Sequence, residues 1–146
     1  SCWGFCYFNN IAISVEKLRQ EGKIERALIV DFDLHYGDGT ANFFSAISEV
    51  LYYHLPSGNR DDQLKELSAY LVTKEDYDII AVSAGFDRHI EDWGGTLERE
   101  DYEEIGKLVK EYAERVCGGK RYAVLEGGYN HQVLGKNVRA FLEGMK

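Results

Sequence analysis

Three short apolar runs, each leading into a loop of polar residues and glycines, most constrain how this chain can fold. Residues 26–33 are apolar from Ala27 to Val30 and end with two aspartates. Residues 77–83 and 121–126 also contain a short apolar run that leads into such a loop. Apolar runs without alternation are typical of strands buried on both faces, which occur in parallel sheets covered by helices. We therefore expect these runs to form strands of a parallel sheet.

Helical segments separate these runs. In residues 9–20 the apolar side chains recur at the spacing of one helix face, with charged residues between them. Thr96 is predicted to cap a long helix that ends near Cys117. Helices are also expected over residues 40–47, 62–71 and 131–142, and a further strand over residues 50–54. Strands that alternate with helices predict an α/β fold with a mainly parallel sheet.

Size and charge limit the classes of partner. A chain of 146 residues is the size of one domain with its own core, so residues 1–146 are predicted to form a single domain. The formal net charge of −8 argues against a nucleic-acid partner, because nucleic-acid binding depends on clustered Lys and Arg. No apolar stretch approaches the roughly 20 residues that span a bilayer, so no membrane partner is expected. The cytoplasm is the expected location, with Cys2, Cys6 and Cys117 as reduced thiols.

The residues that follow the predicted strands carry the candidate chemistry. In an open α/β sheet, ligands bind beyond the carboxyl ends of the strands. Alternation along an extended chain places Asp31, Asp33 and His35 on one face, and Asp87 follows a neighbouring strand. Two carboxylates and an imidazole with an open position form a plausible site for catalytic zinc or a similar divalent ion.

Two other interpretations of these residues stay open on spacing alone. A single aspartate at a strand end, or Asp38 between two glycines, is often only a turn or capping residue. An apolar strand that ends Asp-x-Asp also fits a Mg²⁺-dependent phosphohydrolase, in which Asp31 and Asp33 supply a nucleophile and a metal ligand. That interpretation gives His35 no role. The other histidines are expected to be surface or locally bonded side chains: His54, His89 and His131.

Four short motifs are spread over most of the chain. They are Gly-Phe-Cys-Tyr-Phe-Asn-Asn from Gly4, Asp-Phe-Asp-Leu-His-Tyr-Gly-Asp-Gly-Thr from Asp31, Ser-Ala-Gly-Phe-Asp from Ser83, and Leu-Glu-Gly-Gly-Tyr-Asn from Leu125. In this order they resemble the C-terminal portion of the histone deacetylase and acetylpolyamine amidohydrolase family. The resemblance implies a three-layer α-β-α arginase/deacetylase fold and zinc-dependent hydrolysis of an N-acetylated lysine or polyamine.

The resemblance also implies roles at the reacting centre. It makes Asp33, His35 and Asp87 the zinc ligands. It matches Tyr129 to the tyrosine that donates a hydrogen bond to the substrate carbonyl and to the tetrahedral oxyanion. A phenol opposite the metal would stabilise the negative charge that develops on that oxygen.

Further residues match positions around this centre. Asp31 and Asp38 match catalytic-site acids that, in the family, orient two consecutive histidines. Gly4, Phe5 and Gly128 match positions next to the substrate, and Phe5 matches one aromatic wall of the tunnel that takes the acyl-lysine-like chain.

The sequence departs from the family pattern in two places. The two consecutive histidines precede the Gly-Phe-Cys motif in the family, but this sequence contains no His-His. Residues 50–58 run directly from a predicted strand into a Pro/Gly turn. Relatives carry a few dozen residues there, which form the other tunnel wall and part of a K⁺ site. A catalytically inactive binding module is therefore the alternative to an enzyme.

The length itself implies a further interface. The first strands of the family's catalytic domain have no counterpart in these 146 residues, so we expect a truncated form of the fold. A sheet without its neighbouring strands has an exposed edge. We expect a missing N-terminal segment or a second copy of the chain to cover that edge.

Overall fold

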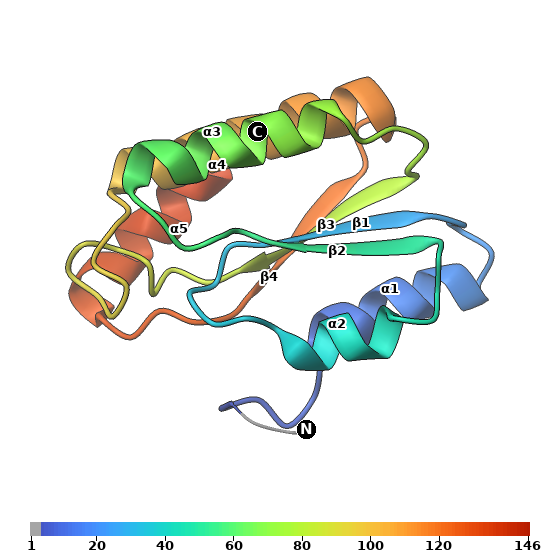
Figure 1. Ribbon diagram of the computed structural model, residues 1–146, viewed down its shortest axis with the longest axis horizontal. Coiled ribbons are helices and arrows are strands. Elements are labelled where there is room, and N and C mark those ends of the chain that lie inside the picture. Colours follow the sequence, from blue (N-terminus) through green and yellow to red (C-terminus); the bar gives the residue numbers. More distant parts are fainter. Residues whose placement is uncertain (1–3) are drawn as a thin grey trace.

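The computed structural model describes residues 4–146, in which helices and strands alternate (Figure 1). The helices are α1 (Asn10–Gln20), α2 (Asp38–Phe44), α3 (Arg60–Val72), α4 (Arg99–Val116) and α5 (His131–Met145). The strands are β1 (Ala27–Asp31), β2 (Val50–His54), β3 (Ile79–Ala84) and β4 (Arg121–Leu125). Each helix and strand predicted from the sequence is present, and the α/β fold class is confirmed.

Within the described residues the strands form one parallel sheet in the order β2-β1-β3-β4. Figure 1 shows α1 and α2 on one face of the sheet and α3, α4 and α5 on the other, which confirms the three layers. Because all strands run the same way, their carboxyl ends meet at one edge. At that edge Asp31 of β1 pairs with His54 of β2 and with Ser83 of β3.

The two central strands, β1 and β3, are buried along their whole length, which explains their continuous apolar sequences. Leu28 and Val30 of β1 belong to the core that α3, α4 and α5 cover. Ala27 and Ile29 point to the opposite face and pack in the core under α1. The outer strands β2 and β4 are mostly half-buried. The loops after β1 and β3 therefore leave the sheet from its most firmly packed part.

The start of α4 differs from the prediction. Thr96 does not cap this helix, because the helix begins at Arg99 and Glu98 is its N-cap. Asp101 accepts a hydrogen bond from Glu98 N at 2.7 Å, so a capping box ends the loop two residues later than expected. Thr96 instead donates through Oγ1 to Arg88 O at 3.1 Å, within the loop that precedes the helix.

The cysteines and the helices show no sign of cross-linking or membrane insertion in the described part of the chain. Cys6 is exposed and Cys117 is buried, and both are free thiols. Burial raises the pKa of Cys117 to about 11. Cys2 lies outside the described residues. Over residues 4–146 no helix is both long and apolar enough to cross a membrane.

Candidate metal centre

Three candidate ligands converge at the carboxyl edge of the sheet. Asp33 and His35 follow β1, and Asp87 follows β3. One ligand atom from each residue lies within 4.8 Å of the other two. His35 Nδ1 is 3.1 Å from Asp87 Oδ2 and 3.3 Å from Asp33 Oδ1. The structure thus brings together the three residues that the sequence marks as metal ligands.

Backbone N–H groups hold both carboxylates in place. Gly127 N, in the loop after β4, donates to Asp33 Oδ2 at 2.8 Å, and Leu34 N donates to Asp87 Oδ1 at 2.9 Å. A Cβ atom at Gly127 would lie 2.5 Å from Asp33 Oδ2 and 2.8 Å from Asp87 Oδ2. Any larger residue at this position would displace the carboxylates, so the close approach requires glycine.

One buried oxygen atom indicates that a cation fits here. Asp87 is 0% exposed, and its Oδ2 accepts no hydrogen bond from the described residues, although His35 Nδ1 lies 3.1 Å away. Burial, followed by the negative charge of Asp33, raises the pKa of Asp87. A buried carboxylate oxygen without a hydrogen bond is costly unless a cation approaches it. Two carboxylates and one imidazole match the ligand set of a divalent ion such as zinc.

Asp31 does not join this cluster, contrary to the expectation from strand alternation. The strand ends at Asp31, and the chain then turns, because Asp31 Oδ1 accepts a hydrogen bond from Asp33 N at 2.9 Å. The hydroxyl of Tyr52 in β2 donates to Asp31 Oδ2 at 2.6 Å. Burial raises the pKa of Asp31 to about 7, although these bonds oppose the shift. A carboxylate that is 3% exposed and bonded at both oxygens is poorly placed to be a nucleophile, which counts against the phosphohydrolase.

Three other candidates from the sequence lie outside the cluster. Asp38 is half-buried and is the first residue of α2. Phe5 is 79% exposed, and its ring meets that of Tyr129 edge-on with the centroids 6.0 Å apart. Gly4, which precedes it, has a φ of 104°. The predicted wall residue of the tunnel therefore lies beside the predicted catalytic tyrosine.

Tyr129 lies in the loop between β4 and α5 and is held by aromatic contacts. Gly128 precedes it with a φ of 142°, and a Cβ there would lie 2.7 Å from Leu134 Cδ1. The Tyr129 ring stacks on Trp93 with the centroids 3.9 Å apart. Trp93 also meets the His35 ring edge-on at 6.0 Å. The stack therefore connects the tyrosine to one of the candidate ligands.

The phenol of Tyr129 is a proton donor at neutral pH. Burial, followed by the negative charges of Asp33 and Asp87, raises its pKa to about 12. The Tyr129 ring adjoins the cluster through Trp93, which contacts His35. The group can therefore donate a hydrogen bond to an oxygen atom beside the metal site.

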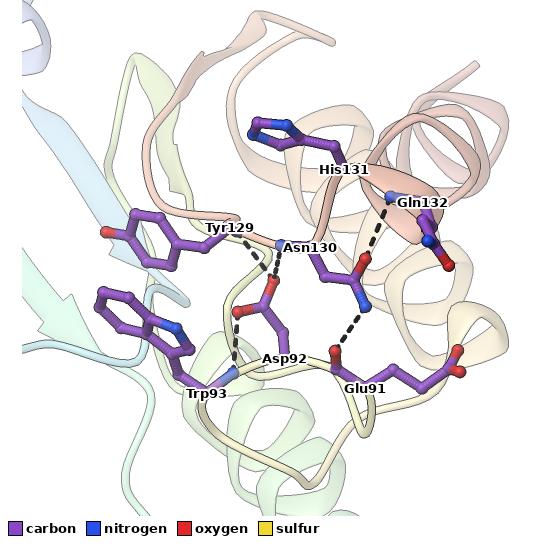
Figure 2. A pocket seen from close by; sticks show the side chains of 7 residues that line it. All are labelled: Glu91, Asp92, Trp93, Tyr129, Asn130, His131 and Gln132. Carbon is purple, nitrogen blue, oxygen red and sulfur yellow. Dashed lines mark hydrogen bonds between the residues drawn. The ribbon is translucent and has the colours of Figure 1, made fainter.

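Asp92 links the loop before α4 to the loop that carries Tyr129, as Figure 2 shows. Asp92 Oδ2 accepts hydrogen bonds from Tyr129 N at 2.8 Å and Asn130 N at 2.7 Å, and Oδ1 accepts from Trp93 N at 2.8 Å. Asn130 Nδ2 also donates to Glu91 O at 2.7 Å. One carboxylate thereby fixes the backbone of both members of the Tyr129–Trp93 stack.

The sequence analysis missed Asp92 and Trp93. Their position in a glycine-containing loop after Asp87 was visible, but their shared partner Tyr129 lies 37 residues beyond Asp92 in the sequence. An open pocket of about 580 Å³ adjoins the stack. Asp33, His35 and Asp87 do not line it, so the ligand cluster locates the chemistry better than the pocket does. The pocket is lined by Glu91, Asp92, Trp93, Tyr129, Asn130, His131 and Gln132.

Two of the remaining histidines are locally bonded, as expected. His54 Nε2 lies 2.9 Å from Asp33 O, and since a carbonyl only accepts, Nε2 carries the proton. Burial lowers the pKa of His54, so the ring is neutral at pH 7. His89 Nδ1 accepts a hydrogen bond from Glu91 N at 3.1 Å.

A known protein family matches most of this sequence. The family model for the histone deacetylase domain matches residues 1–61 and 54–145 of the chain. The two matched segments meet at residues 54–61, which include the turn between β2 and α3. The break in the match therefore falls where the sequence analysis expects relatives to carry an additional segment.

Several relatives match nearly the whole chain. A "Probable deacetylase" from Methanothermobacter thermautotrophicus is 32% identical over 180 residues, covering 97% of this chain and 53% of that protein. "Polyamine deacetylase HDAC10" from Mus musculus is 30% identical and covers 92% of this chain and 26% of that protein. "Histone deacetylase 14, chloroplastic" from Arabidopsis thaliana is 28% identical, with 92% and 40% covered. The chain thus spans about half the length of these relatives, or less.

A solved structure, the crystal structure of the HDA15 HD domain, has the same fold. It matches 99% of this chain with a TM-score of 0.83 at 23% identity, and the match covers 51% of that chain. The 180-residue alignment with the archaeal relative is longer than the 146 residues of this sequence, so that relative carries additional residues within the matched region. The family match over nearly the full chain, together with the fold, shows that this chain belongs to the histone deacetylase family.

Proposed function

We propose that this protein is a zinc-dependent deacetylase that removes acetyl from an N-acetylated lysine or polyamine. The observation that carries the proposal is the cluster of Asp33, His35 and Asp87 next to Tyr129 in a chain of this family. Relatives named as probable, histone and polyamine deacetylases support the reaction class.

Asp33, His35 and Asp87 are the residues that would hold the ion. Zinc bound there would polarise an amide carbonyl and lower the pKa of a water molecule. The contribution of the chain is a fixed arrangement of ligands, since Gly127 N and Leu34 N orient the two carboxylates before any ion arrives. Such outer hydrogen bonds typically account for 10–100-fold in metal affinity or activity.

Tyr129 acts on the substrate oxygen. Its phenol is protonated at neutral pH and donates a hydrogen bond that strengthens as the carbonyl oxygen becomes negative. Trp93 and Asp92 hold the ring and its backbone, so little reorganisation is needed when the charge develops.

The surroundings support an aliphatic, cationic substrate. The ring of Tyr129 contacts the rings of Phe5 and Trp93, and the three rings offer apolar surface for the methylene chain of an acetylated amine. The net charge of −8 favours the approach of a positively charged peptide or polyamine. The cytoplasm stays the proposed location.

An inactive, metal-binding module is the second candidate function. In the family the general base is matched to two consecutive histidines, which these 146 residues do not include. Asp31 and Asp38, the acids matched to that pair, then have no catalytic histidines to orient within these 146 residues. The two candidates predict the same bound zinc but different turnover.

Metal content tests the ligand assignment. We expect one zinc per chain by elemental analysis of the purified protein, and loss of this zinc in Asp33→Ala and His35→Ala. His131→Ala is the matched control, because His131 is exposed and lies outside the cluster. Unchanged zinc in the Asp33 and His35 variants would refute the ligand set.

Turnover separates the candidate functions. We expect the zinc-loaded protein to release acetate from a fluorogenic acetyl-lysine peptide or from an N-acetylpolyamine, and a hydroxamate to inhibit this reaction. Stoichiometric zinc without hydroxamate-sensitive turnover would favour the inactive module. Mg²⁺-dependent release of phosphate from a phosphate ester would instead favour the phosphohydrolase.

A further inference from the structure

Arg88 is a charged side chain buried beside the metal centre. It directly follows Asp87 and is 1% exposed. Its guanidinium lies where the segments after β1 and β2 run side by side, as the acceptors of its hydrogen bonds show. Neither the family motifs nor the proposed chemistry gives this residue a role.

Every N–H bond of the Arg88 guanidinium has an acceptor. Four of the acceptors are main-chain carbonyl oxygens from residues just after β1 and β2, and the fifth is a side-chain amide of α3. Nε donates to Phe32 O (3.0 Å) and Asp33 O (3.1 Å), Nη2 to Asp33 O (3.0 Å) and Leu55 O (2.5 Å), and Nη1 to Pro56 O (3.2 Å) and Gln63 Oε1 (3.0 Å). The positive charge is thus enclosed by oxygen atoms.

A ring of main-chain carbonyl oxygens is also the environment that a monovalent metal cation prefers. The family resemblance implies a K⁺ site, part of which would come from the segment that this chain lacks between β2 and α3. In this structure a guanidinium already fills the position on which the carbonyl groups of Asp33 and Leu55 converge. The residues present therefore do not fit a K⁺ ion at that position.

We propose that Arg88 replaces a monovalent cation, so that the metal centre is independent of K⁺ and Na⁺. A guanidinium carries the same single positive charge and distributes it over five N–H donors in a planar fork. Because the group is covalently attached, its presence does not depend on the ions in solution. This inference concerns the carbonyl ring and does not require that the protein deacetylates any substrate.

The same contacts make Arg88 a positioning residue for a metal ligand. The carbonyl oxygen of Asp33 accepts hydrogen bonds from Nε and Nη2 of Arg88 and from Nε2 of His54. Its carboxylate oxygens face His35 and Gly127 on the other side. Arg88 also interacts electrostatically with the nearby carboxylates of Asp31, Asp87 and Asp33. It therefore both orients Asp33 and offsets negative charge around the site.

The wild-type protein provides the first test. Its melting temperature and its dissociation constant for zinc are measured in the chlorides of potassium, sodium, caesium and choline at equal ionic strength. We expect neither quantity to depend on which cation is present. A melting temperature that is higher in KCl than in choline chloride, and that rises to saturation with KCl concentration, would overturn the proposal. This comparison tests the proposal even if no Arg88 variant folds.

Arg88→Ala provides the second test, because it removes the internal cation and leaves the carbonyl ring. In choline chloride we expect the melting temperature to fall by about 10 °C and zinc binding to weaken about tenfold. Potassium chloride or millimolar guanidinium should recover part of both losses in a saturable manner. An equal loss in every salt, without recovery, would contradict the replacement of a cation.

Arg121→Ala is the matched control. Arg121 also donates to main-chain carbonyl groups, those of Met145 and Gly119, but at the opposite end of β4 from the metal centre. Its loss should lower the melting temperature equally in all salts and leave zinc binding unchanged. A cation-specific recovery in this variant as well would show that the effect does not belong to the ring around Arg88.

Discussion

Tyr129 is the residue whose removal should separate catalysis from metal binding. Tyr129→Phe deletes only the hydroxyl and leaves the ring stacked on Trp93. Loss of one donor to a developing oxyanion typically costs about 3 kcal/mol, which is about 100-fold in kcat. We expect that decrease in acetyl-lysine turnover, with zinc content unchanged. Tyr36→Phe, at an exposed tyrosine, is the control, and a Tyr129→Phe variant with full activity would refute the assigned role.

Glu126 should make the stability of the metal-free protein depend on pH. Burial, followed by the charge of Asp33, raises the pKa of Glu126 to about 7 from an ordinary 4.5. The folded state thus binds this proton more tightly than the unfolded state, so stability falls as pH rises from about 4.5 to about 7 and is constant above. Glu126→Gln removes the buried charge.

The comparison of Glu126→Gln with wild type checks this sign. In the presence of a chelator we expect the variant to be more stable by about 1–3 kcal/mol at pH 8 and nearly equal to wild type at pH 4.5, as measured by urea unfolding. Glu75→Gln, at an exposed position, should not change the pH profile. A stability gain that is the same at both pH values would contradict the buried charge as its cause.

At the level of residues, the convergence of the candidate ligands was predictable, and the groups that support them were not. Asp33, His35 and Asp87 could be found because they follow buried strands, and the carboxyl ends of parallel strands meet at one edge. The position of Asp31 could not be found, because a side-chain bond to Asp33 N ends the alternation at that point. The role of Arg88 depends on where carbonyl groups after two separate strands converge. No local pattern reveals that point.

Among the elements, the loop between β3 and α4 contacts the Tyr129 loop through the Asp92 carboxylate, the Trp93 ring and the Glu91 carbonyl, and the carboxylate can be removed by itself. Asp92→Ala removes the acceptor for the N–H groups of Trp93, Tyr129 and Asn130. We expect faster amide hydrogen exchange in residues 126–132 and about a tenfold lower kcat, with zinc content unchanged.

Glu91→Ala is the matched control for Asp92→Ala. Glu91 is the preceding residue, and Figure 2 shows its side chain directed away from Tyr129, with only its carbonyl oxygen bonded to Asn130. This variant should leave hydrogen exchange and kcat as they are. If Asp92→Ala accelerated no exchange in residues 126–132, the carboxylate would not be what holds the Tyr129 loop.

The elements themselves were largely predictable, because the apolar pattern of each segment agrees with how it is buried in the fold, as in the continuous apolar runs of β1 and β3. The strand over residues 50–54 was predicted with the bounds that β2 has, and the N-terminal helix differs from prediction by one residue. The error at Thr96 arose because a capping box between Glu98 and Asp101 competes with a threonine cap. Both sites look alike in sequence, and only the hydrogen bonds decide which one starts the helix.

At the scale of the whole molecule, the candidate centre draws on distant parts of one sheet. Its groups follow β1, β3 and β4, so the folded state is needed to bring them together. We therefore expect zinc to slow unfolding without accelerating refolding, because an ion that binds only the assembled site stabilises the native state after the transition state. Stopped-flow unfolding in urea, with zinc and with chelator, measures both rates.

Asp33→Ala is the control for this kinetic prediction, since it removes a ligand without altering the topology. Its unfolding rate should be the same with zinc and with chelator. If zinc made the wild type refold faster, the site would already be formed in the transition state. That result would contradict the expectation from the long sequence separations within the site.

The hydrogen bond from Gly127 to Asp33 joins groups 94 residues apart, and this separation has a consequence for biosynthesis. During synthesis, Asp33, His35 and Asp87 leave the ribosome before Gly127, whose N–H group orients Asp33, has been made. The centre is complete only when β4 has been made and paired with β3. Synthesis and closure of the sheet therefore precede the final arrangement of the candidate ligands, and an ion that needs this arrangement would bind last.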